Sequence, residues 1–366
     1  MRGEYQRQAS LLCIVSPEQR VPKGHPLRGI KPLADEALKR LSGLFDEMYS
    51  EEGRPSIPPE RLLKATLLMA LYSVRSERLF CEQLDYNLLF RWFLDMDVIE
   101  PSFDHSVFAK NRARLIAAEA AKGFFREVVA LARERKLLSA EHFTVDGTLI
   151  EAWASLKSFR RKDGQGQPPK DDDPSNPTVD FKGEKRSNAT HESMTDPEAR
   201  LYKKGKGKEA KLSYLGHALM ENRQGLLVDI RVTQANGTAE RETALAMLDE
   251  NLPGKKRLTV GGDKAYDTRD FVKGCRGLKV TPHVARNTER KGGSALDERT
   301  ARHGGYGVSQ RLRKRVEEIF GWLKTIGGLR KTRYVGPEKT QLFAYLTGAA
   351  YNLLRISRLE VAGVCP

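Results

Sequence analysis

The sequence predicts an α/β protein in which a mixed-sheet domain follows an all-helical N-terminal region. Two observations support this prediction. Apolar residues recur at helical spacing through residues 31–138. From residue 139, strand-like and helix-like segments follow in the order β–β–β–α–β–α–β–α, which indicates a mixed sheet and not a plain doubly wound one. At 366 residues, the chain exceeds the usual single domain, so two domains, or one large domain with an insertion, are expected.

The helical region is expected to form an N-terminal domain spanning residues 1–138. Its apolar rhythm predicts helices over residues 34–48, 59–71, 76–96 and 117–137. A shorter helix in FDHSVFAKNRARL carries the cations Lys110, Arg112 and Arg114. A bundle of short helices with a basic member suits DNA docking, but a basic face that is merely solvated explains this pattern equally well.

The second region begins with the strand-like run HFTVDG, which is expected to end on Asp146. Residues 155–210 are rich in Pro, Gly and charges of both signs, so we expect a largely flexible insertion, either ordered by DNA or a tolerated surface loop. Two further strands, KLSYLGHALM and LLVDIRVT, are joined by a turn at residues 221–225. A helix with Thr238 as its cap follows them.

The last part of the chain completes this domain, which is expected to span residues 139–358. The strand RLTVGG delivers Asp263, and a short helix and the strand LKVTPHV come next. Helices are then predicted over residues 308–326 and about 337–358, leaving residues 359–366 as a tail.

The chain is strongly basic, with 63 Lys and Arg residues against 48 Asp and Glu residues and a formal charge of +15. This excess favours a polyanionic partner, either nucleic acid or an anionic membrane surface, and a basic protein without such a partner is the alternative. The cations are spread along the chain and are not gathered on one amphipathic helix, which argues against a membrane. No apolar run approaches the ~20 residues of a membrane span.

Cysteine and histidine usage narrows the possible metal chemistry. The four cysteines, Cys13, Cys81, Cys275 and Cys365, form no CxxC pair, and the seven histidines show no HxxxH spacing. A disulfide framework and a thiolate zinc site are therefore not expected, and a reducing cytoplasm fits best. Any metal chemistry must depend on carboxylates.

Two aspartates, Asp146 and Asp263, stand where strands are expected to end. Functional groups in α/β sheets gather beyond strand ends, although a lone Asp next to Gly is usually a turn residue. Hard divalent cations such as Mg²⁺ take oxygen ligands, and two such ions roughly 3.5–4 Å apart can catalyse phosphodiester chemistry. That arrangement normally needs a third carboxylate.

The predicted helix at residues 308–326 can supply the third carboxylate. Its buried stripe consists of Leu312, Val316, Ile319, Phe320, Leu323 and Ile326. On a helical wheel, Arg313, Lys324 and Glu317 lie at about 100°, 120° and 140° from Leu312, in one row beside the stripe. Glu318 lies at about 240°, where it suits an ordinary surface pair with Lys314. The spacing therefore selects Glu317 over Glu318.

Asp146 in TVDGT, Asp263 in GGDKAYDT and Glu317 in QRLRKRVEEIFGWLK resemble the DDE triad of bacterial insertion-sequence transposases. The pattern is most similar to the insertion sequence 5 group of the insertion sequence 4-type superfamily. That superfamily carries the signature Tyr-x2-Arg-x3-Glu-x6-Lys, which Arg313, Glu317 and Lys324 match, while Gln310 stands in place of the tyrosine. The resemblance covers about residues 20–355.

The resemblance implies an RNase H-like catalytic domain that binds two Mg²⁺ or Mn²⁺ ions through Asp146, Asp263 and Glu317. It implies DNA cleavage at transposon ends and strand transfer into target DNA, by a protein that works at least as a dimer in the bacterial cytoplasm, associated with the nucleoid. The residues expected to contact DNA are Arg313, Lys324, Gln310, Lys264, Tyr266, Lys110, Arg112 and Arg114, with structural roles equally open for Lys264 and Tyr266.

Two other functions fit the same residues. An RNase H-like nuclease or resolvase would use the same ions without strand transfer. A transposase-derived DNA-binding regulator would be catalytically silent, which the intact triad argues against. Strand-transfer products and metal-dependent cleavage distinguish the three.

Overall fold

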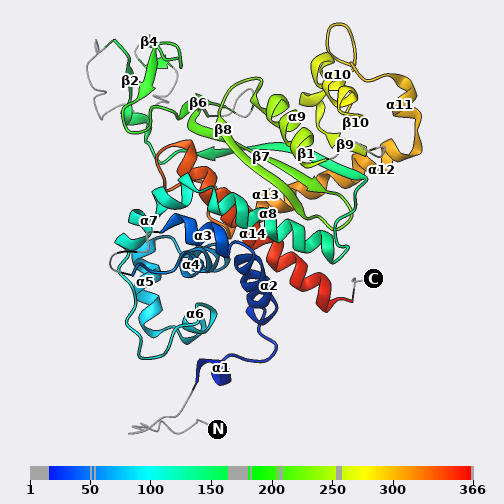
Figure 1. Ribbon diagram of the computed structural model, residues 1–366. Coiled ribbons are helices and arrows are strands. Elements are labelled where there is room, and N and C mark those ends of the chain that lie inside the picture. Colours follow the sequence, from blue (N-terminus) through cyan, green and yellow to red (C-terminus); the bar gives the residue numbers. More distant parts are fainter. Residues whose placement is uncertain are drawn as a thin grey trace, which may run out of the picture.

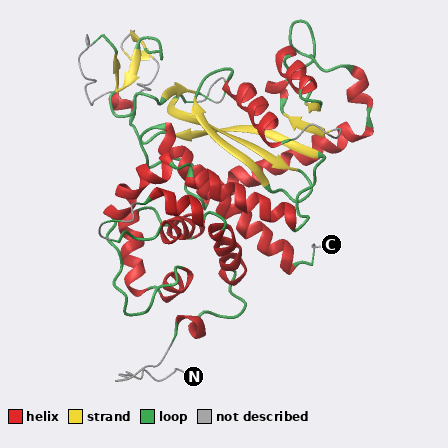
Figure 2. Ribbon diagram, in the orientation of Figure 1, coloured by secondary structure: helices red, strands yellow, loops and turns green. Residues whose placement is uncertain are grey.

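A mixed β-sheet lies between two helical layers in the computed structural model, with the N-terminal helices on one side of it (Figures 1 and 2). The structure describes residues 16–49, 52, 55–163, 180–181, 184–203, 205, 209–252 and 258–363. Cys13 and Cys365 lie outside these residues, and Cys81 and Cys275 are buried free thiols. No helix in the described ranges has both the length and the apolarity needed to cross a bilayer.

The N-terminal region is helical, as predicted. Its helices are α1 Pro17–Arg20, α2 Leu27–Lys39, α3 Ser42–Met48, α4 Pro59–Leu71, α5 Glu77–Tyr86, α6 Leu88–Phe93, α7 Ser106–Ala117 and α8 Ala120–Glu134. Pro59 occupies the first position of α4, and the Ser76 hydroxyl caps α5 by accepting from the Leu79 N–H. The single helix predicted over residues 34–48 is wrong, because the chain breaks between α2 and α3 and Leu41 turns into the core.

The main sheet is built around β1 His142–Glu151. Its other strands are β6 Arg200–Tyr202, β7 Lys211–Glu221, β8 Leu227–Gln234, β9 Leu258–Gly262 and β10 Val280–Val284. β7 runs antiparallel to β1, β8 and β6, while β9 runs parallel to both β1 and β10. The predicted mixed sheet is confirmed, and its predicted strands follow in the expected order, with α9 Ala239–Asn251 and α10 Arg269–Gly277 at the expected places; the short strand β6 was not predicted.

One predicted helix cap differs from the structure. Thr238 precedes α9, but its side chain makes no capping bond. The Asn236 Oδ1 atom instead accepts from the N–H groups of Thr238 and Ala239, at 2.9 and 2.7 Å. An Asn two positions upstream therefore satisfies the first free donors of this helix.

The described part of residues 155–210, where a largely flexible insertion was predicted, forms short ordered elements, and the rest of that range lies outside the described residues. It contains η1 Leu156–Ser158 and the strands β2 Phe159–Arg161, β3 Asp180–Phe181, β4 Glu184–Lys185 and β5 His191–Ser193. The carboxylate of Asp196, 0% exposed, accepts from the Tyr214 hydroxyl of β7 at 2.6 and 2.7 Å. Residues 164–179, within the predicted insertion, lie outside the described residues.

The helical region and the sheet share one core. The last helix, α14 Pro337–Val361, packs on α2, α4 and α8 on one side and on β8 on the other. Buried apolar residues from Val21 to Leu359 belong to a single cluster that includes both regions. The predicted tail at 359–366 therefore begins too early, since α14 continues to Val361. A second cluster fills the other face of the sheet beneath α9 and α10.

The segment predicted as one helix over residues 308–326 is interrupted. The structure has α11 Glu298–Arg302, α12 Gly304–Leu312, the 3₁₀ turn η3 Arg313–Arg315 and α13 Val316–Thr325. Four residues of the predicted apolar stripe, from Val316 to Leu323, are buried, but Ile326 is 39% exposed. A 3₁₀ turn advances about 120° per residue instead of 100°, so positions before and after η3 do not share one helical wheel.

Candidate active site

Asp146 in β1 and Asp263, directly after β9, stand at equivalent places along two neighbouring segments. The parallel pairing of these strands ends at Thr144 and Gly261, and each aspartate stands two residues further along its chain. Adjacent strands are about 4.8 Å apart, so this register brings the two carboxylates into one neighbourhood. The expectation that Asp146 ends its strand is wrong, because β1 continues to Glu151. Only the pairing of β1 with β9 ends before Asp146, at Thr144.

Local backbone bonds orient both carboxylates. The Asp146 Oδ1 atom accepts from the Gly147 N–H at 2.8 Å. Asp263 follows β9 directly, and its Oδ1 atom accepts from the Ala265 N–H at 2.8 Å, which caps the 3₁₀ turn η2 Lys264–Tyr266. Each bond uses one carboxylate oxygen, and a carboxylate has further lone pairs with which it can bind a cation.

Tyr266 is buried beside these aspartates and does not reach the surface. It is 1% exposed, and its ring packs on Phe271 with the centroids 5.1 Å apart. Burial raises the pKa of its hydroxyl well above the usual value, and the negative charges of Glu240, Asp146 and Asp263 raise this pKa further. The expected contact of Tyr266 with DNA does not fit this position, because the aromatic side chain fills the core beneath the site.

Glu240 is a carboxylate near the site that sequence reasoning missed. It lies in the first turn of α9, and a Cβ atom placed on Gly147 would overlap its carboxylate. Gly147 therefore lets α9 approach β1 next to Asp146. Gly147 was a signal in the sequence, because a glycine within a strand often marks the close approach of another part of the chain. The sequence does not show which element approaches.

Polar bonds fix α12 to the end of β10. The Tyr306 hydroxyl donates to the Val284 carbonyl at 3.0 Å, and the Ser309 hydroxyl lies 2.7 Å from the His283 Nδ1 atom. Gln310 donates from its Nε2 atom to the His283 carbonyl. Burial lowers the pKa of His283 to about 4, so this imidazole is neutral at pH 7. These bonds hold the segment that leads into η3 and α13.

Gln310 also holds Arg313. Its Oε1 atom accepts from the Arg313 Nε atom at 3.0 Å, so the amide bridges β10 and the guanidinium. The Cβ atom of Arg313 lies 3.4 Å from the place where a Cβ on Gly261 would stand, which puts Arg313 over the β9 strand just before Asp263. Both polar ends of Gln310 are engaged within the protein, in contrast to the direct DNA contact expected from its place in the signature.

Glu317 and Lys324 belong to α13, which packs on β1. Glu317 is exposed and Lys324 is half-buried, and their spacing of seven places them on the same face of the helix. Glu318 is also exposed and lies near α14, where its charge raises the pKa of Tyr351 after the larger effect of burial. Trp322 packs edge-on against Tyr351, which assigns it a packing role.

The carboxylates do not form a closed metal cluster in this arrangement. Within the described residues, no three His, Cys, Asp or Glu side chains are gathered closely enough to hold a metal ion. The register nevertheless brings two aspartates together, and their all-oxygen donors suit Mg²⁺ or Mn²⁺. The donor chemistry therefore fits the expected ions, with Glu317 on the adjoining helix.

Of the other residues expected to contact DNA, three are exposed and one interacts with other side chains of the protein. Lys264, Lys110 and Arg114 are exposed. Arg112 instead forms an ion pair with Glu77 of α5 and lies over the Tyr334 ring, 4.6 Å from its centroid. The prediction that Arg112 binds DNA does not fit this geometry, since its guanidinium joins the helical region to the segment before α14.

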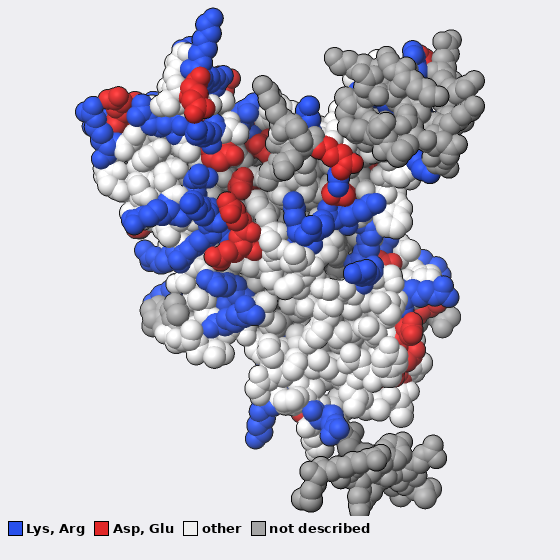
Figure 3. Space-filling model, turned by 180° about the vertical axis from the view of Figure 1, so that it is seen from behind, with Lys and Arg blue, Asp and Glu red and all other residues white. Residues whose placement is uncertain are grey.

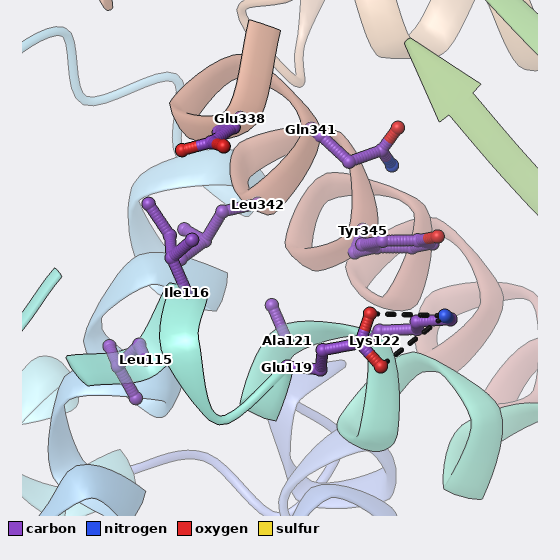
Figure 4. Close-up of a pocket in the computed structure, with 9 residues that line it drawn as sticks. All are labelled: Leu115, Ile116, Glu119, Ala121, Lys122, Glu338, Gln341, Leu342 and Tyr345. Carbon is purple, nitrogen blue, oxygen red and sulfur yellow. Dashed lines mark hydrogen bonds and ion pairs between the residues drawn. The ribbon is translucent and has the colours of Figure 1, made fainter. Parts of the chain in front are cut away.

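A mainly apolar cavity of about 300 Å³ lies elsewhere, between the α7–α8 junction and α14 (Figure 4). Leu115 and Ile116 come from α7, Leu342 and Tyr345 from α14, and none of the expected catalytic residues lines it. In the view from behind, Lys and Arg gather over the upper part of the molecule, while the lower helical part of that face carries few charges (Figure 3). On this face, the Lys and Arg side chains therefore lie mainly over the part of the molecule that contains the sheet.

Comparisons with known proteins give the family. Residues 15–114 match a family described as "Transposase domain (DUF772)", and residues 140–353, more than half of the chain, match the "Transposase DDE domain". No curated protein matches.

Two solved structures illustrate the distant structural matches. One is the piggyBac transposase synaptic complex with hairpin DNA, at 12% identity and a TM-score of 0.41, covering 93% of this chain and 76% of that one. Another is the Mos1 mariner paired-end complex with Mn, at 15% identity and a TM-score of 0.21, covering 90% of this chain and 86% of that one. Both scores are too low to support an argument, so the family assignment depends on the domain match: this chain belongs to the DDE-domain transposases and is a transposase enzyme.

Proposed function

We propose that this transposase cuts DNA at transposon ends and transfers the freed 3′-hydroxyl groups into target DNA, as a member of the insertion sequence 5 group. The observation that carries the proposal is the pair of aspartates, Asp146 in β1 and Asp263 directly after β9, each two residues beyond the last paired position of these strands and within the DDE-domain match. An RNase H-like fold is proposed with it, supported by three antiparallel strands continued by two parallel ones in one sheet.

The proposed metal ligands are Asp146, Asp263 and Glu317. Two bound Mg²⁺ or Mn²⁺ ions would activate the attacking oxygen and stabilise the leaving one. Arg313 and Lys324, on either side of Glu317, would bind phosphates of the transposon end. Because two ends must be paired, we propose a dimer in the DNA complex.

The adjacent glutamates of α13 give the sharpest test. Asp146→Asn and Glu317→Gln are expected to reduce Mg²⁺-dependent cleavage of transposon-end DNA by more than about a hundredfold, since changes to mere partners of metal ligands already cost 10–100-fold. The substrate is a duplex carrying the inverted repeat that flanks the coding region. Glu318→Gln is the matched control, because it makes the same change one residue away and is expected to cleave as wild type.

Product analysis separates the candidate activities. Strand-transfer products in a donor–target assay are expected for a transposase, whereas a nuclease releases only nicks or breaks. If Asp146→Asn protein cleaved transposon-end DNA as fast as wild type, the Asp146 carboxylate would have no part in catalysis. Equal losses of cleavage activity in Glu317→Gln and Glu318→Gln would contradict the choice of Glu317 over Glu318 as the third metal ligand.

A further inference from the structure

A basic cleft of about 670 Å³ lies beside the candidate site. It is framed by the first turn of α9, the start of α10 and the loop at residues 285–296 between β10 and α11. Arg241, Arg269, Arg290 and Lys291 contribute its cations, and Asp270 is the one acidic residue of its lining. We call these four cations, with the space between them, the basic cleft.

The loop that forms one wall is built into the fold. The carboxylate of Asp267, 1% exposed, accepts from the N–H groups of Asn287, Ala295 and Leu296 at 2.7, 2.9 and 3.3 Å. Arg290 donates to the Asp267 carbonyl at 3.2 Å. The loop turns through Gly292 and Gly293, whose φ angles of +94° and +72° favour glycine. A buried carboxylate thus holds this wall, four residues after Asp263 in the same sequence motif.

The cations of the basic cleft differ from their neighbours in having no acidic partner. No ion pair within the described ranges involves Arg241, Arg269, Arg290 or Lys291. By contrast, Arg276 pairs with Asp297, and Arg302 pairs with Glu298 at 2.7 Å, in the same part of the molecule. Arg269, Arg290 and Lys291 are exposed. Four like charges around one hollow repel each other, so a polyanion that bridges them is favoured.

The basic cleft opens next to the carboxylates. Arg241 donates to the Gly237 carbonyl at 2.9 Å and lies 3.5 Å from the Ala265 carbonyl, two residues after Asp263. Its charge also acts on Tyr266, beside Asp146 and Asp263. A strand bound in this hollow would therefore pass directly to the site where cleavage is proposed.

We propose that the basic cleft binds the phosphodiester backbone of a DNA segment that runs past Asp263, a contact distinct from those of Arg313 and Lys324 on α13. The proposal rests on the proposed function. The shared chemistry is a row of phosphates, and the DNA comes either from the transposon end or from the target. Arg and Lys contacts to phosphate make binding depend steeply on salt, which gives a readout independent of catalysis.

The test compares two double variants. Arg269→Gln/Arg290→Gln removes two charges from the basic cleft. Arg276→Gln/Arg302→Gln removes two ion-paired charges nearby and serves as the control. Both are made in full-length Asp146→Asn protein, and binding to an inverted-repeat duplex and to an unrelated target duplex is measured by fluorescence anisotropy between 50 and 200 mM salt. Thermal melting confirms that both variants fold.

The cleft variant is expected to reduce the magnitude of the negative slope of log affinity against log salt by roughly 1.8, since each lost phosphate contact contributes about 0.9. Loss on the inverted-repeat duplex alone assigns the basic cleft to the transposon end, and loss on both duplexes assigns it to DNA of any sequence, including the target. A slope as steep as that of the control variant overturns the proposal. Failure of the proposed function would show separately, as absence of cleavage by the wild-type protein in Mg²⁺.

Discussion

The contacts that Gln310 makes in the structure differ from the role that its place in the sequence motif suggested. It occupies the tyrosine position of the signature, and the signature suggested a DNA contact. In the structure its amide joins the His283 carbonyl to the Arg313 guanidinium. A bridging amide fixes the direction of a long cation and reduces the side-chain entropy that Arg313 loses on binding phosphate. Gln310 is therefore a positioning residue for Arg313.

A double-mutant cycle tests this role. Gln310→Ala and Arg313→Ala are each expected to weaken binding of transposon-end DNA by on the order of tenfold, and the double variant by little more than Arg313→Ala alone. The reason is that Gln310 acts only through Arg313. Arg311→Ala, an exposed cation on α12, serves as a control for general loss of charge. Additive losses in the cycle would instead mean that Gln310 touches DNA itself.

Residue-scale prediction from sequence depends on how far chemistry alone constrains the choice. Asp146 and Asp263 were selected as carboxylates at expected strand ends; β1 continues past Asp146, and the parallel pairing of β1 with β9 ends two residues before each aspartate. Tyr266 and Arg112 could not be assigned, because a tyrosine or an arginine in a motif looks the same whether its partner is DNA, Phe271 or Glu77. Glu240 was missed because its proximity to Gly147 depends on how α9 crosses the sheet.

At the scale of elements, periodicity identified the strands and most helices but not their interruptions. The apolar stripe from Val316 to Leu323 reads as one helix with the residues before it, since a three-residue 3₁₀ turn hardly disturbs the pattern. The short strands β2 and β5 were also missed, because three-residue segments carry too few residues to show alternation. These two strands pair with each other although a long stretch of sequence separates them.

The pairing of β7 with β8 leads to a prediction about pH. His217 on β7 is 1% exposed, and its Nε2 atom lies 2.8 Å from the Thr233 Oγ1 atom of β8. Burial lowers its pKa from 6.5 to about 4. Below pH 6.5 the unfolded chain therefore binds a proton that the folded chain does not, so the free energy of unfolding falls as the pH drops from 6.5 towards 4.

For this histidine alone, the loss at pH 5 relative to pH 7 is on the order of 2 kcal/mol. His217→Gln is expected to remove most of that loss, as measured by urea unfolding at the two pH values. His105→Gln, an exposed histidine in the helical region, is expected to leave the loss unchanged. An equal pH dependence in His217→Gln and wild type would contradict the assignment.

At the scale of the whole molecule, α14 joins parts that the sequence presented as separate domains. The predicted boundary near residue 139 is a real change from helices to strands, and the two family matches fall on either side of it. It is not a boundary of packing, because α14 supplies one surface to α2, α4 and α8 and another to β8. Periodicity marks which residues are apolar and leaves open which distant element covers them.

This shared core predicts cooperative unfolding. Leu353→Ala, at a fully buried position of α14, is expected to destabilise the protein by about 2–5 kcal/mol and to reduce hydrogen-exchange protection in α4 and β8 alike. Leu354→Ala, at the half-buried neighbouring position, is the control and is expected to have a smaller effect on both. Loss of protection confined to the strands would show that the helices are stable independently.

The position of α14 also has a consequence for the time course of folding. A side chain on Gly29 of α2 would overlap the Ser357 hydroxyl of α14, so two segments from opposite ends of the sequence are in intimate contact. Contacts between such distant segments raise the contact order and slow folding, because a very large loop must close before they form. The apolar faces of α2, α4 and α8 therefore stay uncovered until α14 arrives, and we expect refolding yields to fall steeply with protein concentration as these faces associate between molecules.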